Sequence, residues 1–104
     1  MGSPMRGVEE LEELDRVFGA LGHRTRRAIL LVMHANGGEM TSGSIANRFS
    51  CAWQTTSRHL RVLHEAGLVE AVLRGRERVY RLDNGRLQTL TAAWLERFNQ
   101  NEGE

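Results

Sequence analysis

The stretch that decides the fold is FSCAWQTTSRHLRVLHEAGLVEAVLRGRERVYRL, residues 49–82. Its first half repeats apolar residues at helical spacing, with two leucines on the side opposite a group of short polar and basic side chains. Its second half holds two apolar runs with a period of two, joined by an Arg-Gly-Arg bend around Gly75. The stretch therefore predicts a helix over about 53–66, ended by Gly67, and a β-hairpin over about 69–82.

A shorter helix precedes the one at 53–66 and is separated from it only by Ser-Cys-Ala at 50–52. Thr41 or Ser42 can cap its start, and the apolar residues of TSGSIANRF recur at helical spacing up to Phe49. Two helices joined by so short a turn form a helix-turn-helix. With the hairpin beside it, this unit is a winged helix.

Three more helices complete the expected order. VEELEELDRVFGAL predicts a helix from Val8 to a stop at Gly22, RTRRAILLVMHA predicts the next one before Gly37, and Asp83 can cap a last helix with a wide apolar face. The result is a mainly α (α+β) fold, a winged helix-turn-helix with about five helices and a two-stranded β-wing. The arginines that begin the second helix oppose its dipole, so we expect them either to pair with the acidic first helix or to serve another purpose.

The chain of 104 residues has the length of a single domain, which we expect to span residues 8–99. Residues 1–7, which open with a segment typical of a cloning scar, and residues 100–104 are expected to be disordered ends. No run of about 18 apolar residues is present, so no membrane-spanning segment is predicted. The single Cys51 fits the reducing cytoplasm, and we expect a small buried apolar side chain there rather than a redox sensor.

The net charge of +1 conceals a basic middle between two acidic ends. Residues 23–82 hold ten arginines and four glutamates. Residues 1–22 hold two arginines and five acidic residues, and residues 83–104 hold two arginines and four acidic residues. A basic central region suits a polyanionic ligand such as nucleic acid.

The polar face of the helix at 53–66 is the candidate for reading DNA. A recognition helix presents its first turns to the major groove, where Gln suits adenine, Arg suits guanine, and Ser or Thr hold phosphates. The candidates on this face are Gln54, Thr55, Ser57, Arg58 and Arg61. The alternative is a solvated helix face, and Trp53 either lies on the DNA or packs into the turn.

The wing carries further candidates in Arg74, Arg76 and Arg78, which surround its expected tip. They suit contacts to phosphates or to the minor groove. The alternative is that they only protect an edge strand from aggregation.

The first and last helices carry more apolar surface than a protein of this size covers alone. We expect the two helices to form the interface of a homodimer. The residues concerned are Leu11, Leu14, Phe18, Leu90, Trp94 and Phe98.

The run Ser-Arg-His-Leu at 57–60, Ala-Gly-Leu-Val at 66–69 and a wing closed by Tyr-Arg-Leu at 80–82 resemble the ArsR/SmtB family of bacterial winged-helix repressors. The resemblance extends from about Val17 to Leu82 and includes the upstream segment FGALGHRTRRAIL. It implies a homodimer built from the first and last helices, a recognition helix that binds an operator, and release by an effector.

The chain departs from this family at the places where its metal sensors bind their ions. TSGSIANRF has no Cys or His where the sensors carry Cys-x-Cys, and the last helix has no His. The four histidines, His23, His34, His59 and His64, do not cluster at ligand spacing. We therefore expect no metal site and no cofactor. Ala52 stands where the family often has a capping Ser, so we expect Ser50 to cap the recognition helix.

The expected function is sequence-specific DNA binding by a bacterial cytoplasmic repressor that recognises an inverted-repeat operator. A small-molecule effector of unknown identity can fit at the dimer interface without leaving a motif. One alternative is a metal-responsive repressor with an unrecognised site, and another is a winged helix that serves as a protein-interaction module. The sequence shows no paired carboxylates, nucleophile–base set or phosphate loop, so we do not expect an enzyme.

Overall fold

The computed structural model of the protein describes residues 4–50 and 52–99. It confirms the predicted fold class, with a helix-turn-helix followed by a β-hairpin wing. Its elements are α1 (Pro4–Leu21), α2 (Arg24–Ala35), β1 (Glu39–Thr41), α3 (Ser42–Arg48), α4 (Trp53–Glu65), β2 (Val69–Arg74), β3 (Glu77–Leu82) and α5 (Asn84–Asn99).

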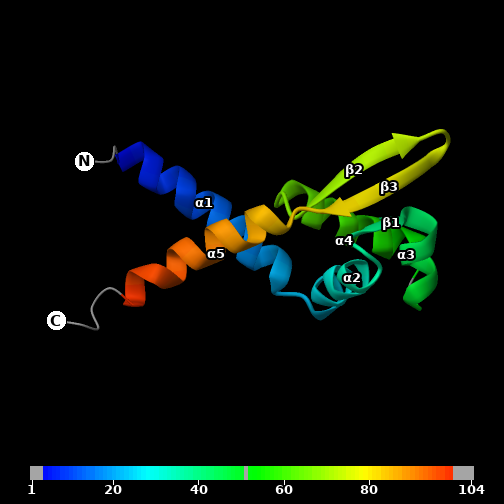
Figure 1. The fold of residues 1–104 in the computed structure, drawn as a ribbon, viewed down its shortest axis with the longest axis horizontal. Coiled ribbons are helices and arrows are strands. Elements are labelled where there is room, and N and C mark those ends of the chain that lie inside the picture. Colours follow the sequence, from blue (N-terminus) through cyan, green and yellow to red (C-terminus); the bar gives the residue numbers. More distant parts are fainter. Residues whose placement is uncertain (1–3, 51, 100–104) are drawn as a thin grey trace.

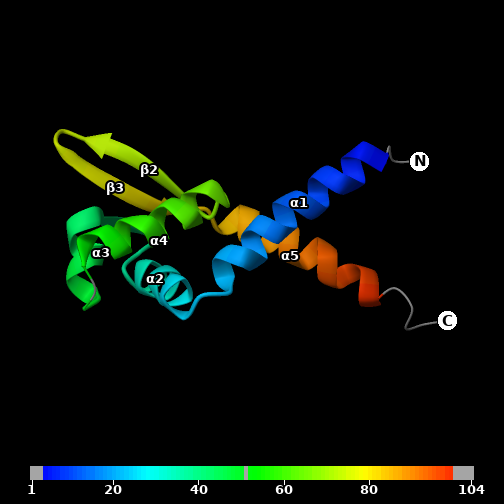
Figure 2. The same cartoon turned by 180° about the vertical axis from the view of Figure 1, so that it is seen from behind.

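The molecule is elongated, with principal extents of 53 × 27 × 22 Å. Helices α2, α3 and α4 and the sheet form a body at one end (Figure 1). Helices α1 and α5 cross each other and extend away from that body, so that the first turn of α1 and the last turn of α5 lie at the opposite end of the molecule (Figures 1 and 2). We call the two crossing helices the arms.

Two details of the fold differ from the sequence prediction. The sheet has a third strand, β1, and its order is β1–β3–β2 with every pair antiparallel. Helix α1 begins at Pro4 rather than Val8, so residues 4–7, expected to be disordered, are helical. Proline suits the first position of a helix, because its missing N–H would have no partner there. Residues 1–3 and 100–104 lie outside the described part of the chain.

The starts of α3 and α5 and the end of α4 follow the capping signals of the sequence. The Thr41 side chain accepts from the backbone N–H of Ser44 at the start of α3, and Asp83 accepts from that of Arg86 at the start of α5. After α4, Gly67 has φ +78°. The N–H groups of Gly67 and Leu68 donate to the last carbonyls of the helix, which is the Schellman arrangement.

The arginines at the start of α2 satisfy carbonyl groups at the end of α1. Arg26 donates to the carbonyl oxygens of Gly19 and Ala20 at 3.2 and 2.8 Å, and Arg27 donates to that of Leu21 at 2.7 Å. A helix C-terminus carries partial negative charge, so the two cations stabilise α1 through its backbone. Among the described residues, neither Arg26 nor Arg27 forms an ion pair with an acidic side chain of α1.

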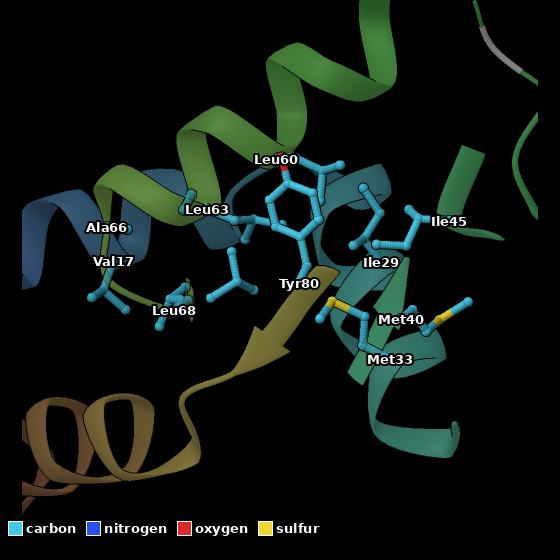
Figure 3. Close-up of a cluster of buried hydrophobic side chains, with 12 residues drawn as sticks. Val17, Ile29, Met33, Met40, Ile45, Leu60, Leu63, Ala66, Leu68 and Tyr80 are labelled. Atoms are coloured by element: carbon cyan, nitrogen blue, oxygen red, sulfur yellow. The ribbon is translucent and has the colours of Figure 1, made fainter. Parts of the chain in front are cut away.

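One hydrophobic core joins the helices of the body to the sheet. Figure 3 shows the side chain of Tyr80 pointing from β3 toward Leu60 of α4, with Met33 of α2 nearby. Leu60 and Leu63 of α4 are fully buried. Burial of these two leucines fixes the rotation of α4 and turns its polar face outward. No helix of the described residues is long and apolar enough to cross a membrane.

Candidate nucleic-acid interface

The outward face of α4 gathers the residues predicted to read DNA. Gln54, Arg58 and Arg61 are exposed, and Thr55 and Ser57 are partly buried. Gln54, Ser57, Arg58 and Arg61 line one open hollow of about 260 Å³ together with Trp53. The structure therefore places four of the five predicted residues of α4 around one concave surface.

Trp53 and the turn before it differ in part from expectation. The side chain of Trp53 is 47% exposed and lines the same hollow, so it lies on the surface rather than packing into the turn. The N-cap of α4 is Ala52, and no side chain caps the helix. The expected cap by Ser50 is therefore wrong, because the chain reaches the N-cap position two residues later. Cys51 lies outside the described residues.

The wing has two chemically different faces because successive side chains of a strand alternate. Leu73 pairs with Arg78 across the hairpin, and both lie on the side that faces α4. Arg74 points to the other side, where its guanidinium forms an ion pair with Glu39 of β1. Arg81 also contacts Glu39, at 3.6 Å. The structure thus separates Arg74 from Arg78, although the sequence placed both in one group.

A groove of about 370 Å³ runs between α4 and the wing. Its polar lining includes Ser57, Arg61 and His64 from α4 and Arg78 from the wing. No carboxylate of the described residues lines it. The groove therefore offers hydrogen-bond donors and positive charge on both walls, which is the chemistry that binds a phosphodiester strand.

The tip of the wing is a two-residue turn formed by Gly75 and Arg76. Gly75 has φ +65° and Arg76 does not have a positive φ, which is the pattern of a type II′ turn. Arg76 is exposed there. It is the predicted residue furthest from α4 along the hairpin.

One residue of this surface, Leu73, was missed in the sequence, and His64, for which packing and phosphate contact were both open, lines the groove. His64 lies three residues after Arg61, so helical spacing could have placed it on the same face. Leu73 is 66% exposed, and only the register of the hairpin shows that it accompanies Arg78.

The arms carry the second predicted surface. The ring of Trp94 contacts those of Phe18 and Phe98 edge-on, with centroids 5.4 and 5.1 Å apart. Leu11 and Phe98 are exposed, and Leu90 is half-buried. Leu14 is already buried within one protomer, with only 7% of its surface exposed. The structure therefore assigns Leu14 largely to the packing between the arms of one chain, and leaves the other apolar residues accessible to differing degrees.

The histidines are closer in space than along the chain. The rings of His23 and His59 lie 4.5 Å apart, and Nδ1 of His59 is 3.2 Å from a terminal nitrogen of Arg26. Burial lowers the pKa of His59, and electrostatic repulsion from His23, Arg26 and Arg58 lowers it further. Within residues 4–50 and 52–99, no three His, Cys, Asp or Glu side chains are placed to hold a metal ion.

Comparisons with known proteins agree with this geometry. A family model described as a helix-turn-helix domain matches residues 21–72. The transcriptional repressor SdpR of Bacillus subtilis is 31% identical over 88% of this chain and 99% of its own length.

Solved structures are similar over most of the chain as well. An ArsR-like transcriptional regulator from Rhodococcus sp. RHA1 is 36% identical, with a TM-score of 0.74 over 86% of this chain and 82% of that one. The homodimeric winged helix-turn-helix DNA-binding domain Mb0332 from Mycobacterium bovis is 26% identical. Its TM-score is 0.72 over all of this chain and 95% of its own.

Proposed function

This chain belongs to the ArsR family of winged helix-turn-helix transcriptional regulators, and we propose that it represses transcription by binding an inverted-repeat operator as a homodimer. The family and the fold are those of regulators and not of enzymes. The observation that carries the proposal is the cationic surface formed by the outward face of α4 and the adjoining groove.

Recognition of base pairs is assigned to the first turns of α4. The buried leucines hold this helix with Gln54 and Arg58 outward, in the position from which a recognition helix enters the major groove. Gln54 matches the donor–acceptor pair of adenine, and Arg58 matches the two acceptors of guanine. Trp53, exposed beside them, offers apolar contact to a thymine methyl group.

Phosphate binding is assigned to the groove and to the wing tip. Arg61 and His64 on one wall and Arg78 on the other can hold one strand of the duplex between recognition helix and wing. Arg76, at the tip of the wing, extends the contact toward the adjacent groove of the DNA. Arg74 is given a smaller role, because Glu39 already neutralises its charge.

Dimerisation is assigned to the arms. Phe98 is 62% exposed at the far end of α5, and Leu11 and Phe18 are exposed on α1. The homodimeric state of the Mycobacterium bovis domain supports pairing of two such chains. Two-fold symmetry would present two recognition helices to half-sites whose centres lie about 34 Å apart, one helical turn of DNA.

Repression rather than activation is supported by the likeness to SdpR, which is named a transcriptional repressor. A repressor of this kind works in the bacterial cytoplasm, on the nucleoid. An effector that releases the DNA belongs to the proposal as a small molecule of unknown identity.

The experiment is selection of bound fragments from the source genome, followed by affinity measurements on the enriched sequence and on its scrambled version. We expect an inverted repeat to be enriched.

Substitution of Arg58 by Ala should weaken binding by about 1–3 kcal/mol and relax the base preference at one position of each half-site. Arg81→Ala, on the wing face turned away from α4, is the matched control and should keep the preference. Unchanged affinity and preference in Arg58→Ala would contradict the assignment of α4.

A further inference from the structure

His59 lies on the side of the recognition helix that faces the corner between α1 and α2. It is only 8% exposed, whereas Arg58 and His64 of the same helix are exposed. This histidine therefore cannot reach DNA as α4 is oriented. Its surroundings indicate a different use.

The hydrogen bond between Arg26 and His59 defines the protonation state of the imidazole. A guanidinium group has donors only, so Nδ1 of His59, 3.2 Å from Arg26, must be the acceptor. Nδ1 therefore carries no proton, and the imidazole is neutral. Adding a proton to Nδ1 would remove the acceptor and place two cations against each other.

Arg26 joins three elements through one guanidinium group. It donates to the carbonyl oxygens of Gly19 and Ala20 at the end of α1, it belongs to the first turn of α2, and it donates to His59 of α4. The ring of His23, whose Nδ1 also caps α2 by accepting from the backbone N–H of Thr25, lies 4.5 Å from the ring of His59. Arg26 thus connects α4 to the corner between α1 and α2, and its hydrogen bond to α4 depends on a neutral His59.

The charged groups around His59 all oppose its protonation. The side chains that disfavour the protonated form are His23 from the corner, Arg26 from α2 and Arg58 from α4 itself. Helix α4 also packs against α1, α3 and β2. Within the described ranges, these three elements contribute no charged side chain that acts on the imidazole.

We propose that His59 is a proton-sensitive latch that holds the recognition helix against the α1–α2 corner while its imidazole is neutral and releases it in acid. Release breaks the Arg26 contact and drives the guanidinium away from α4. The helix then loses part of its fixed position relative to the arm α1. The consequence for DNA binding rests on the function proposed above, whereas the consequence for the protein alone does not.

The sign of the pH dependence follows from the lowered pKa of His59. In the unfolded chain, histidine titrates near its ordinary value of about 6.5. The folded state resists the proton, so its stabilisation is complete above about pH 6.5 and is lost as the pH falls toward the folded-state pKa. The folding constant should change by at most about tenfold per pH unit for each His59.

The first experiment uses the protein without DNA. Thermal unfolding is measured from pH 7.5 to 5.5 for the unmodified protein, His59→Asn and His64→Asn. Asparagine can keep an acceptor near the place of Nδ1 and does not titrate, and the variant at 64 makes the same substitution at an exposed position of the same helix. We expect the loss of stability in acid to be weaker in His59→Asn and unchanged in His64→Asn. An equal pH dependence in all three proteins would overturn the latch.

A second readout does not require any variant to fold. The imidazole carbon–proton resonance of His59 is followed through the same pH range in the unmodified protein, together with backbone amides of α4 and the α1–α2 corner. We expect these amides to shift with the titration of His59, at a pH below that of an ordinary histidine. Titration at or above the ordinary value, or corner amides that do not respond, would also overturn the proposal.

The third measurement adds the selected operator duplex. Lowering the pH should weaken binding by the unmodified protein several-fold, and His59→Asn should reduce this loss. If no sequence is bound at any pH while the corner still responds to His59, the proposed function fails and the latch stands. If specific binding is present but its pH dependence is the same in His59→Asn, the function stands and its control by this latch fails.

Discussion

Arg74 and Arg78 are four positions apart in the sequence and lie on opposite faces of the wing. Arg78 shares the groove with α4, whereas Arg74 is paired with Glu39. The charge of one residue is therefore available to a phosphate strand, and the charge of the other is already compensated. Exposure alone does not distinguish the two residues, because both are exposed.

Substitution of Arg78 by Ala should weaken binding to all DNA sequences to a similar extent. Each lost phosphate contact lowers the salt dependence of the logarithmic affinity by about 0.9, so the loss in a dimer is about two. Arg74→Ala is the matched control and should leave this slope nearly unchanged. The measurement is fluorescence anisotropy with labelled duplex across a range of salt concentrations. Equal slopes for the two variants would mean that both faces of the wing contact DNA.

The sequence could not separate these arginines because the separation depends on a tertiary partner. Arg-Gly-Arg predicted the wing tip, and strand alternation then follows from the register of the hairpin. The partner of Arg74 comes from β1, however, and three residues after a Gly-Gly pair show no strand pattern. In the same way, His23 and His59 are far apart in the sequence, and only the packing of α4 on the α1–α2 corner brings their rings together.

Helix α4 is held at its end by a glycine as well as along its buried side. A Cβ atom at Gly67 would lie 2.2 Å from Nε of Arg86. That Nε donates to the carbonyl oxygen of Ala66 at 2.7 Å and so connects the start of α5 to the end of α4. Gly75 also has a positive φ, but no atom lies within 4 Å of the place of its Cβ. Both glycines therefore adopt a positive φ, but only Gly67 has a neighbouring side chain where a Cβ atom would lie.

Alanine at these two positions should separate backbone strain from crowding. Gly75→Ala should lower the free energy of unfolding by about 1–2 kcal/mol, the cost of a left-handed backbone for a residue with a Cβ. Gly67→Ala should cost at least about 1 kcal/mol more, because Arg86 must give up its hydrogen bond as well. Chemical denaturation at fixed pH measures both values. A Gly67→Ala variant as stable as Gly75→Ala would show that Arg86 moves aside without loss.

The elements themselves were predictable where apolar spacing runs through a whole segment. Helices α2 and α4 and the hairpin have such spacing, and Gly37, Gly67 and Gly75 mark their ends or turns with positive φ. The start of α1 was misplaced because the segment before Val8 lacks apolar spacing of its own. The start of α4 was predicted, but its cap was not, since Ala52 provides no side-chain acceptor.

At the scale of the whole molecule, the body and the arms bury their apolar side chains to different degrees. Val17 and Ala20 of α1 complete the core of the body, whereas α5 has no fully buried side chain among its described residues. The arms extend along the 53 Å axis and carry exposed aromatic and aliphatic side chains. We propose that a second copy of the chain buries these exposed side chains.

Substitution of Phe98 by Glu should dissociate the proposed dimer, because it puts a charge into the apolar surface that pairing would bury. Leu73→Glu is the matched control, since Leu73 is 66% exposed and Phe98 is 62% exposed, and Leu73 lies on the wing instead. Sedimentation at micromolar concentration should give twice the 11.8 kDa chain mass for the unmodified protein and for Leu73→Glu. Phe98→Glu should sediment as a monomer. A monomeric unmodified protein would contradict the dimer itself.

If a second copy completes the arms, as proposed, the amount of protein in the cell becomes part of the switch. Occupancy of a two-fold site by a chain that pairs only weakly rises with the square of the free chain concentration, and a dilute chain also lacks part of its stabilisation. A small change in synthesis or degradation would then produce a larger change in repression. Regulation of this kind needs no effector, because dosage itself sets the threshold.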